Sequence, residues 1–191
     1  MNGKHKANPE AGGPPVLLLP GWLNSGPGHW QSRWETKHGY VRVEQDDWLW
    51  PRRGDWMARL DAVLLEQTQP VLLAAHSLGC QLVAAWAAHS RHTARVAGAM
   101  LVAPPDTERD DMPPNLFNWR PIVRVRLPFA SLVVASADDP YCALPRSQAM
   151  ACDWGSEFED IGARGHINGD SGLGDWPQGI ELLRRLAGTP G

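Results

Sequence analysis

The chain has 191 residues, which is enough for one domain with a sizeable hydrophobic core. Its composition is 43% hydrophobic and 20% charged, its formal net charge is -3, and its isoelectric point is near 6.1. These values are ordinary for a soluble globular protein. They argue against a nucleic-acid partner, because the chain contains no basic run that could follow a phosphate backbone.

Residues 1–15 are polar and include glycine and proline, so we expect a disordered lead-in rather than a signal peptide. The longest apolar runs, such as residues 82–88, are far too short to span a bilayer, and no membrane span is expected. Three cysteines, an odd number without a CxxC pair, argue against a disulfide framework and a zinc site. They are Cys80, Cys142 and Cys152. These features predict a cytoplasmic protein with free thiols.

Short apolar runs, bounded by glycine and proline, alternate with helix-like segments along the rest of the chain. In chain order the pattern predicts strand 16–19, strand 40–43, helix 54–67, strand 71–75, helix 78–90, strand 96–102, strand 131–135, helix 146–150, strand 157–161 and helix 180–186. Such alternation is typical of a mostly parallel sheet covered by helices on both faces. We therefore predict a three-layer α/β/α sandwich in a single domain, residues 16–188.

Ligands bind beyond the carboxyl ends of the strands in sheets of this kind, so the loops that follow the strands are the places to search. The loop after strand 71–75 places Ser77 between Ala75 and Gly79, as a variant of the G-x-S-x-G nucleophile elbow. The residues two before and two after such a serine must be small, or they collide with the sharp turn. A helix cap is the alternative role for Ser77, because serine favours that position.

A serine hydroxyl becomes a good nucleophile only when a base takes its proton and an acid orients that base. Asp138 and Asp139 follow strand 131–135, and His166 follows the last predicted strand on a glycine-rich loop. Serine, carboxylate and histidine thus all lie at strand ends. Spacing alone leaves open which of the two aspartates is the acid.

A tetrahedral intermediate also needs donors for its negative charge. The backbone N–H of Leu78, which follows the serine, is one candidate. The second candidate is the backbone N–H of Trp22, because Gly21 lets the loop after strand 16–19 approach closely. A phosphate cradle is the alternative for this loop, but it lacks the lysine and the glycine spacing of such motifs.

The sequence resembles small, lid-poor α/β-hydrolases of the serine hydrolase family that includes the retinoblastoma-binding hydrolases and many bacterial relatives. The resemblance covers residues 16–186. It depends on six short segments: residues 19–22 (LPGW), 29–30 (HW), 46–48 (DDW), 76–79 (HSLG), 138–140 (DDP) and 165–168 (GHIN). It implies a minimal α/β-hydrolase fold with a short or absent lid. The L-x-C-x-E signature of retinoblastoma binding does not occur, so no such partner is inferred.

The resemblance further implies a catalytic triad of Ser77, His166 and Asp139, because the Asp-Pro step is usual at the acid position. Asp138 is then expected to cap the loop. Residues 106–128 are too short for a full cap domain, so we expect a fairly open site that this segment partly covers.

Four side chains are candidates for the lining of the substrate pocket. They are His29, Trp30, His76 and Trp119. An aromatic rim would suit an apolar acyl or alcohol group. The alternative is that the tryptophans fill the core, and a purely structural role is equally open for His29.

Together these features predict a carboxylesterase-type serine hydrolase (EC 3.1) that cleaves a small ester, thioester or amide through an acyl-enzyme. We expect a small-molecule substrate and neither metal nor organic cofactor. Two alternatives stay open: a catalytically silent binding protein with the hydrolase fold, and acyl transfer or perhydrolysis on the same triad.

Overall fold

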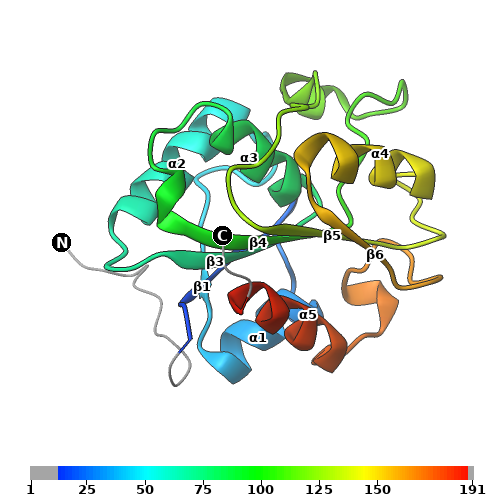
Figure 1. The fold of residues 1–191 in the computed structure, drawn as a ribbon. Coiled ribbons are helices and arrows are strands. Elements are labelled where there is room, and N and C mark those ends of the chain that lie inside the picture. Colours follow the sequence, from blue (N-terminus) through cyan, green and yellow to red (C-terminus); the bar gives the residue numbers. More distant parts are fainter. Residues whose placement is uncertain (1–12, 189–191) are drawn as a thin grey trace.

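The structure is a computed structural model that describes residues 13–188. A six-stranded sheet with the order β2-β1-β3-β4-β5-β6 lies between two layers of helices (Figure 1). Every strand pair is parallel, and the sheet is open. The predicted three-layer α/β/α sandwich is therefore confirmed, with a sheet that is parallel throughout.

Most strands coincide with short apolar runs of the sequence, but the last one, residues 157–160 (EFED), does not. The strands are β1 (Val16–Leu19), β2 (Val41–Arg42), β3 (Val71–His76), β4 (Val96–Val102), β5 (Ser131–Ala135) and β6 (Glu157–Asp160). The strands β1, β3 and β5 are buried along their whole length, as expected for a sheet covered on both faces. The edge strand β2 is only two residues long, shorter than predicted.

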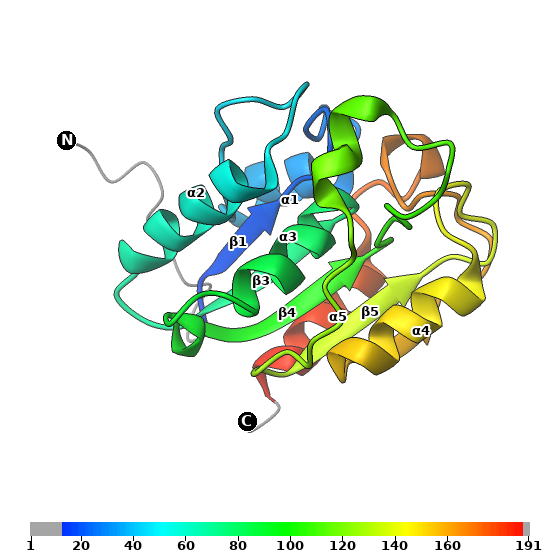
Figure 2. The same cartoon turned by 90° about the horizontal axis from the view of Figure 1, so that it is seen from above.

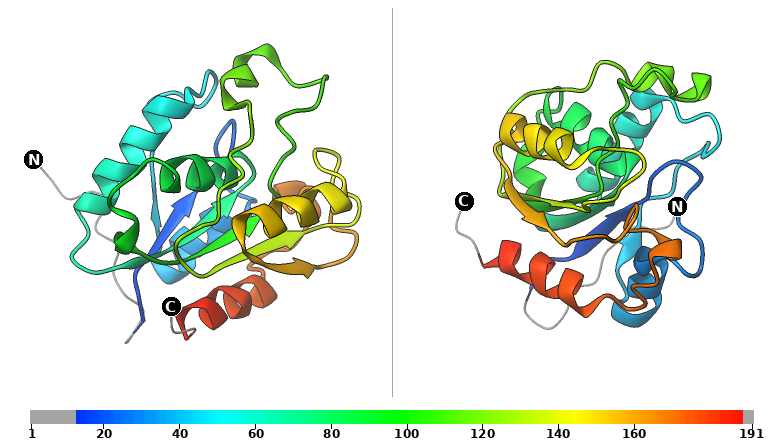
Figure 3. Two further views of the ribbon diagram at one scale, coloured as in Figure 1. Left: turned by 45° about the horizontal axis from the view of Figure 1, so that its top comes forward. Right: turned by 90° about the vertical axis from the view of Figure 1, so that its right-hand side faces the viewer.

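Five α-helices and three short 3₁₀ helices connect the strands in the described part of the chain. The α-helices are α1 (Trp30–His38), α2 (Arg53–Leu65), α3 (Leu78–Ala87), α4 (Leu144–Trp154) and α5 (Pro177–Ala187). The 3₁₀ helices are η1 (Thr93–Arg95), η2 (Pro114–Trp119) and η3 (Gly169–Ser171). Helices α2, α3 and α4 cover one face of the sheet, and α1 and α5 cover the other (Figure 1, Figure 3).

Helix α1 was missed by the sequence prediction. Its nine residues are mostly polar, and only Trp30, Gln31 and Trp34 are buried. Helix α4 is longer than predicted at both ends, because it begins at Leu144, before Pro145, and continues to Trp154 instead of ending at residue 150. The other predicted helices are confirmed with small shifts at their ends.

Each face of the sheet has its own hydrophobic core. The core beneath α2, α3 and α4 contains Trp56, Trp86, Trp119 and Trp154. The core beneath α1 and α5 contains Trp30, Trp34 and Trp176. Most of the tryptophans therefore fill the interior, which is the alternative that the sequence left open.

Three further predictions concern the whole chain. The predicted lead-in, residues 1–15, falls almost wholly outside the described residues, and the domain limits 16–188 stay a prediction. All three cysteines are free, although Cys152 is exposed. Between residues 13 and 188 no helix has the length and apolar character needed to cross a membrane.

The strand order indicates where in the sheet a ligand-binding crevice is expected. Strand β1 lies between β2 and β3, so the chain changes direction across the sheet at β1 and β3. The loops beyond the carboxyl ends of the strands gather along one edge (Figure 2). A crevice at such a switch point is where open parallel sheets bind ligands, and the loops after β1 and β3 are those that carry Trp22 and Ser77.

Candidate active site

Ser77 occupies a strained turn between β3 and α3. Its backbone angles are φ 54° and ψ -123°, a region that non-glycine residues rarely adopt. The turn is held by a hydrogen bond from the Ser77 N–H to the Val102 carbonyl oxygen at 2.9 Å. This geometry is that of a nucleophile elbow, which projects a serine from the end of a strand.

The two residues that flank the elbow, Ala75 and Gly79, are small for a steric reason. A β-carbon added to Gly79 would lie 2.4 Å from the carbonyl oxygen of Leu19, which is closer than real contacts allow. Ala75 is fully buried on β3. The elbow therefore packs directly against the end of β1, and larger side chains at these positions would push the two strands apart.

Ser77, His166 and Asp139 come together although they are far apart in the sequence. The Nε2 atom of His166 lies 2.8 Å from the Ser77 Oγ. The Nδ1 atom of His166 lies 3.0 and 2.9 Å from the two carboxylate oxygens of Asp139. A base within hydrogen-bond reach of the nucleophile, oriented by a third group, is the geometry of covalent catalysis.

Asp138 has a different set of partners. Its Oδ1 accepts hydrogen bonds from the Ser136 hydroxyl at 2.8 Å and from the Gly165 N–H at 2.7 Å. The Ser136 hydroxyl, followed by the Gly165 N–H, holds the pKa of Asp138 below its usual value. Asp138 thus ties the loop after β5 to the loop before His166, which is the capping role that the resemblance implied.

The side chains of Asp139 and His166 are shielded from water. The side chain of Asp139 is 3% exposed and that of His166 is 10% exposed. The Tyr141 ring packs edge-on against His166 at 4.6 Å, and the Tyr141 N–H donates to Asp139 Oδ1 at 2.9 Å. A buried hydrogen bond between histidine and carboxylate is stronger than an exposed one, and it fixes the orientation of the ring.

The loop after β1 reaches the serine, as its glycine predicted. A β-carbon added to Gly21 would lie 2.7 Å from the Ser77 Cβ and 3.1 Å from the Leu78 nitrogen. In the described chain, the N–H groups of Trp22 and Leu78 make no hydrogen bond to protein. Two such donors beside a nucleophile can receive a developing oxyanion.

A cavity of about 530 Å³ opens onto these groups. Its lining includes the apolar residues Trp22, Met112 and Leu116 and the polar residues Asn24, His29, His76, Asn168 and Asp170. The predicted lining residues His29 and His76 do face this cavity.

Trp30 and Trp119 do not line the cavity, and for these two residues the lining prediction was wrong. Both are 1% exposed. The Trp30 indole donates to the Ile167 carbonyl oxygen at 2.9 Å, and the Trp119 indole donates to that of Pro51 at 2.8 Å. Each indole N–H thus finds its partner in the interior, which is the usual arrangement for a buried tryptophan.

The segment 106–128 forms a short lid that carries η2. It contributes Met112, Pro113 and Leu116 to the cavity. Glu108 anchors the segment. Its carboxylate accepts a hydrogen bond from the Ile122 N–H and forms ion pairs with Arg124 and Arg146. Burial opposes ionisation of Glu108, but these contacts outweigh it and hold its pKa below the usual value.

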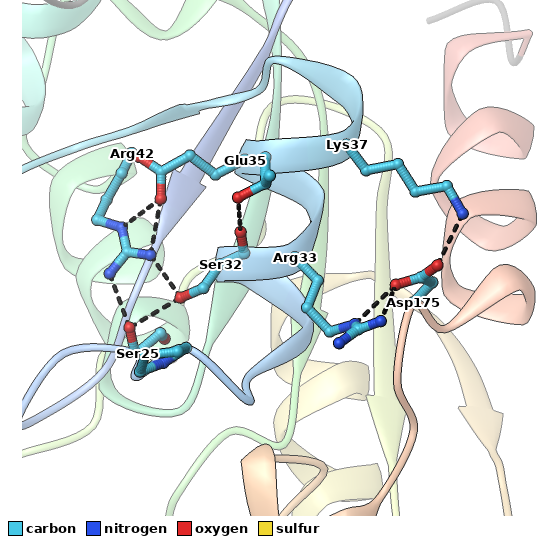
Figure 4. Close-up of a pocket in the computed structure, with 9 residues that line it drawn as sticks. Ser25, Ser32, Arg33, Glu35, Lys37, Arg42 and Asp175 are labelled. Carbon is cyan, nitrogen blue, oxygen red and sulfur yellow. Dashed lines mark hydrogen bonds and ion pairs between the residues drawn. The ribbon is translucent and has the colours of Figure 1, made fainter.

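A second hollow, of about 590 Å³, lies beside α1 (Figure 4). Its charged side chains are occupied with one another: Arg33 and Lys37 contact Asp175, and Arg42 contacts Glu35. A hollow whose cations are already neutralised by neighbouring carboxylates offers less to a ligand than the cavity at Ser77.

One residue that supports the candidate site from behind, Gln31, was not predicted. Gln31 is fully buried, and its amide donates to the carbonyl oxygens of Leu19 and Ala74 at 3.1 and 2.9 Å. It ties α1 to the ends of β1 and β3. The sequence feature that could have pointed to Gln31 is its position directly after the His29-Trp30 pair. It was missed because the polar α1 was not recognised as a helix.

A parallel α/β/α sheet with a serine on a strained elbow at its switch point defines the class of α/β-hydrolase folds. The chain belongs to the serine hydrolase family, whose sequence profile matches residues 16–185. A comparison with curated protein sequences gave no match. The narrower resemblance to retinoblastoma-binding hydrolases stays a prediction.

Solved structures support the family and the fold. A protein from Pectobacterium atrosepticum described as a YdeN-like hydrolase is 31% identical, with a TM-score of 0.78 over 90% of this chain and 89% of that chain. The ydeN gene product of Bacillus subtilis is 19% identical, with a TM-score of 0.68 over 90% of this chain and 97% of that one. The esterase RhEst1 from Rhodococcus sp. is 15% identical, with a TM-score of 0.70 over 97% and 94%. The last two matches bear on the fold alone.

Proposed function

We propose that this serine hydrolase is a carboxylesterase-type enzyme that cleaves small ester, thioester or amide substrates through an acyl-enzyme on Ser77. The observation that carries the proposal is the 2.8 Å contact between His166 Nε2 and Ser77 Oγ, with Asp139 on the opposite ring nitrogen. This contact occurs on the strained elbow, in a cavity that Trp22 and Leu78 also line.

In the first half-reaction the Ser77 Oγ attacks the carbonyl carbon while His166 Nε2 takes the hydroxyl proton. Asp139 holds the ring in the tautomer that leaves Nε2 free and stabilises the imidazolium that forms. The N–H groups of Leu78 and Trp22 donate to the oxyanion. The bond to the leaving group then breaks, and His166 returns the proton to the leaving atom.

In the second half-reaction water takes the place of the leaving group. His166 removes a proton from that water, which attacks the acyl carbon, and the proton then returns to Ser77 Oγ. The chemistry uses only side chains and backbone groups of this chain. The apolar residues of the cavity lining, Trp22, Met112 and Leu116, suit the acyl group of the substrate. Free thiols suit a reducing cytoplasmic setting.

Fluorophosphonate labelling tests the proposal directly, because this probe reacts only with an activated serine. We expect one adduct by intact mass on the native protein, and none on the heat-denatured protein or on Ser77→Ala. Ser90→Ala is a matched control, since Ser90 lies beyond the far end of α3 and bonds Asp61; it should label like the wild type.

Absence of an adduct on protein that is folded by circular dichroism would contradict the proposal and favour the binding-protein alternative. If the adduct forms, product analysis with p-nitrophenyl acetate and a competing alcohol or peroxide separates hydrolysis from acyl transfer and perhydrolysis.

A further inference from the structure

Two buried histidines outside the catalytic trio lie in a line that ends on the backbone of His166. The Nε2 atom of His29 is 3.3 Å from the Nδ1 atom of His76, and the Nε2 atom of His76 is 2.9 Å from the His166 carbonyl oxygen. Both rings are nearly inaccessible, with 6% and 5% exposure. The mechanism above assigns neither of them a role.

The hydrogen-bond partners at the two ends of this line determine which ring nitrogen of each histidine carries the proton. The Gln31 N–H can only donate, and it lies 3.1 Å from His29 Nδ1, so that atom accepts. A neutral His29 then carries its proton on Nε2 and donates to His76 Nδ1, which leaves the His76 proton on Nε2. That proton is donated to the carbonyl oxygen of His166, which can only accept. One arrangement of protons satisfies every contact, and it requires both rings to be neutral.

The stretch of backbone that receives this bond is strained. Gly165 and Ile167, which flank His166, both have positive φ, 54° and 50°. For a β-branched residue such as Ile167 this conformation is unfavourable and persists only where the surroundings enforce it. Two contacts from the start of α1 do so: the Trp30 indole donates to the Ile167 carbonyl oxygen at 2.9 Å, and the histidine line reaches the preceding carbonyl.

The His76 ring also packs against the catalytic ring itself, with ring centroids 4.9 Å apart. A charge on His76 would disfavour the imidazolium that forms on His166 when it takes the serine proton. Burial keeps His76 neutral by lowering its pKa well below the usual value, and this outweighs the hydrogen bond to the His166 carbonyl oxygen, which acts in the opposite direction. The line therefore fixes the base without adding a competing cation.

From these contacts we infer that His29, His76 and Trp30 are positioning residues, which hold two successive carbonyls of the His166 loop so that Nε2 points at Ser77. The inference rests on the proposed function. It adds to that function a reason for the His29-Trp30 pair and for a histidine directly before the nucleophile.

The first test is the rate of fluorophosphonate labelling at saturation, compared with the probe concentration that gives half of that rate. We expect His76→Leu to lower the saturating rate about 10- to 100-fold, as for a displaced catalytic group, with little change in the half-saturating concentration. His76→Gln keeps an amide donor for the His166 carbonyl and should recover most of the rate. His89→Leu is the matched control, because His89 also bonds a backbone carbonyl, that of Ala85, but at the far end of α3.

Two outcomes would overturn the inference. One is a folded His76→Leu that labels at the wild-type rate. The other is equal slowing in His76→Leu and His76→Gln, which would mean that His76 only fills space. A wild-type protein that does not label at all would instead contradict the proposed function.

The second test does not depend on activity. In protein labelled with ¹⁵N-histidine, NMR at neutral pH should show His29 and His76 as neutral rings with the proton on Nε2. His29→Asn keeps an acceptor for the Gln31 N–H and should release the His76 tautomer. A proton on Nδ1 of either ring in the wild type would overturn the inference, whether or not Ser77 labels.

Discussion

Gly21 packs against Ser77 so closely that a β-carbon at Gly21 would lie 2.7 Å from the Ser77 Cβ. The nearest other atoms, the His76 carbonyl oxygen and the Leu78 nitrogen, would both be 3.1 Å away. These three atoms are backbone atoms of the elbow or the Cβ attached to it, so they cannot move away by a side-chain rotation. The close approach places the start of the loop that carries Trp22 against the elbow, and it is possible because residue 21 is a glycine.

We predict that Gly21→Ala displaces the loop after β1 and withdraws the Trp22 N–H from the oxyanion. Loss of one such donor lowers kcat by about 10²- to 10³-fold. Turnover of p-nitrophenyl acetate measures the loss. Gly54→Ala in α2 is the control, because a β-carbon there meets nothing within 4 Å. Unchanged turnover in Gly21→Ala would remove Trp22 from the oxyanion hole.

The two adjacent aspartates give a second prediction. Asp139→Asn should lower kcat by about 10³- to 10⁴-fold, because an amide stabilises the wrong tautomer of His166. Asp138→Asn should retain most of the activity, since the amide oxygen can still accept from the Gly165 N–H. The pair is matched in size and charge, and kcat for p-nitrophenyl acetate compares the two. Equal losses, or a larger loss in Asp138→Asn, would make Asp138 the acid.

Much of the fold and of the candidate site could be predicted from the sequence, because both depend on strand ends. The strands β1, β3 and β5 are short apolar runs bounded by glycine, proline or polar residues, a pattern typical of strands buried on both faces. Once the strands are placed, parallel topology brings the segments behind them to one edge. Ser77 and His166 could therefore be paired across the chain from sequence position alone.

The missed parts depend on tertiary contacts. Helix α1 has no apolar stripe and a histidine as its N-cap, so neither periodicity nor a usual cap residue marks it. The direction in which a tryptophan side chain points also cannot be predicted from the sequence. Trp30 and Trp119 both flank loops, yet each points inward because a backbone carbonyl there accepts its N–H.

A third prediction concerns stability against pH. Burial, followed by the charges of Arg42 and His166, lowers the pKa of His29 from 6.5 to about 3. Between those values the unfolded chain binds a proton that the folded chain does not. The free energy of unfolding should therefore rise with pH across this window and level off above 6.5. His76, whose pKa is also lowered, contributes in the same direction.

Urea unfolding between pH 5 and 6.5 measures this slope in a range where carboxylates are already ionised. His29→Asn removes one of the two buried rings and should reduce the slope by up to about 1.4 kcal/mol per pH unit. His92→Asn is the control, because His92 is 42% exposed and lies away from the cavity. An identical slope in the wild type and in His29→Asn would contradict the prediction.

A fourth prediction concerns which lining residues of the cavity contact the acyl group. Met112 lies on the lid segment and is one of the apolar residues that line the cavity. Shortening this side chain should make room for a longer acyl chain. Met112→Ala is expected to raise the ratio of kcat/KM for p-nitrophenyl octanoate to that for the acetate by about 10-fold, the discrimination that one or two methylenes provide in an apolar pocket. Met112→Trp should lower the same ratio.

The control for this change is Val125→Ala on the same segment, since Val125 is 53% exposed and is not among the residues that line the cavity. It should leave the ratio unchanged, which separates a local effect in the cavity from loosening of the whole lid. A loose lid would raise KM for both esters alike, whereas a wider cavity favours only the longer one. If neither Met112 variant moves the ratio, the acyl group does not contact Met112 and the prediction is wrong.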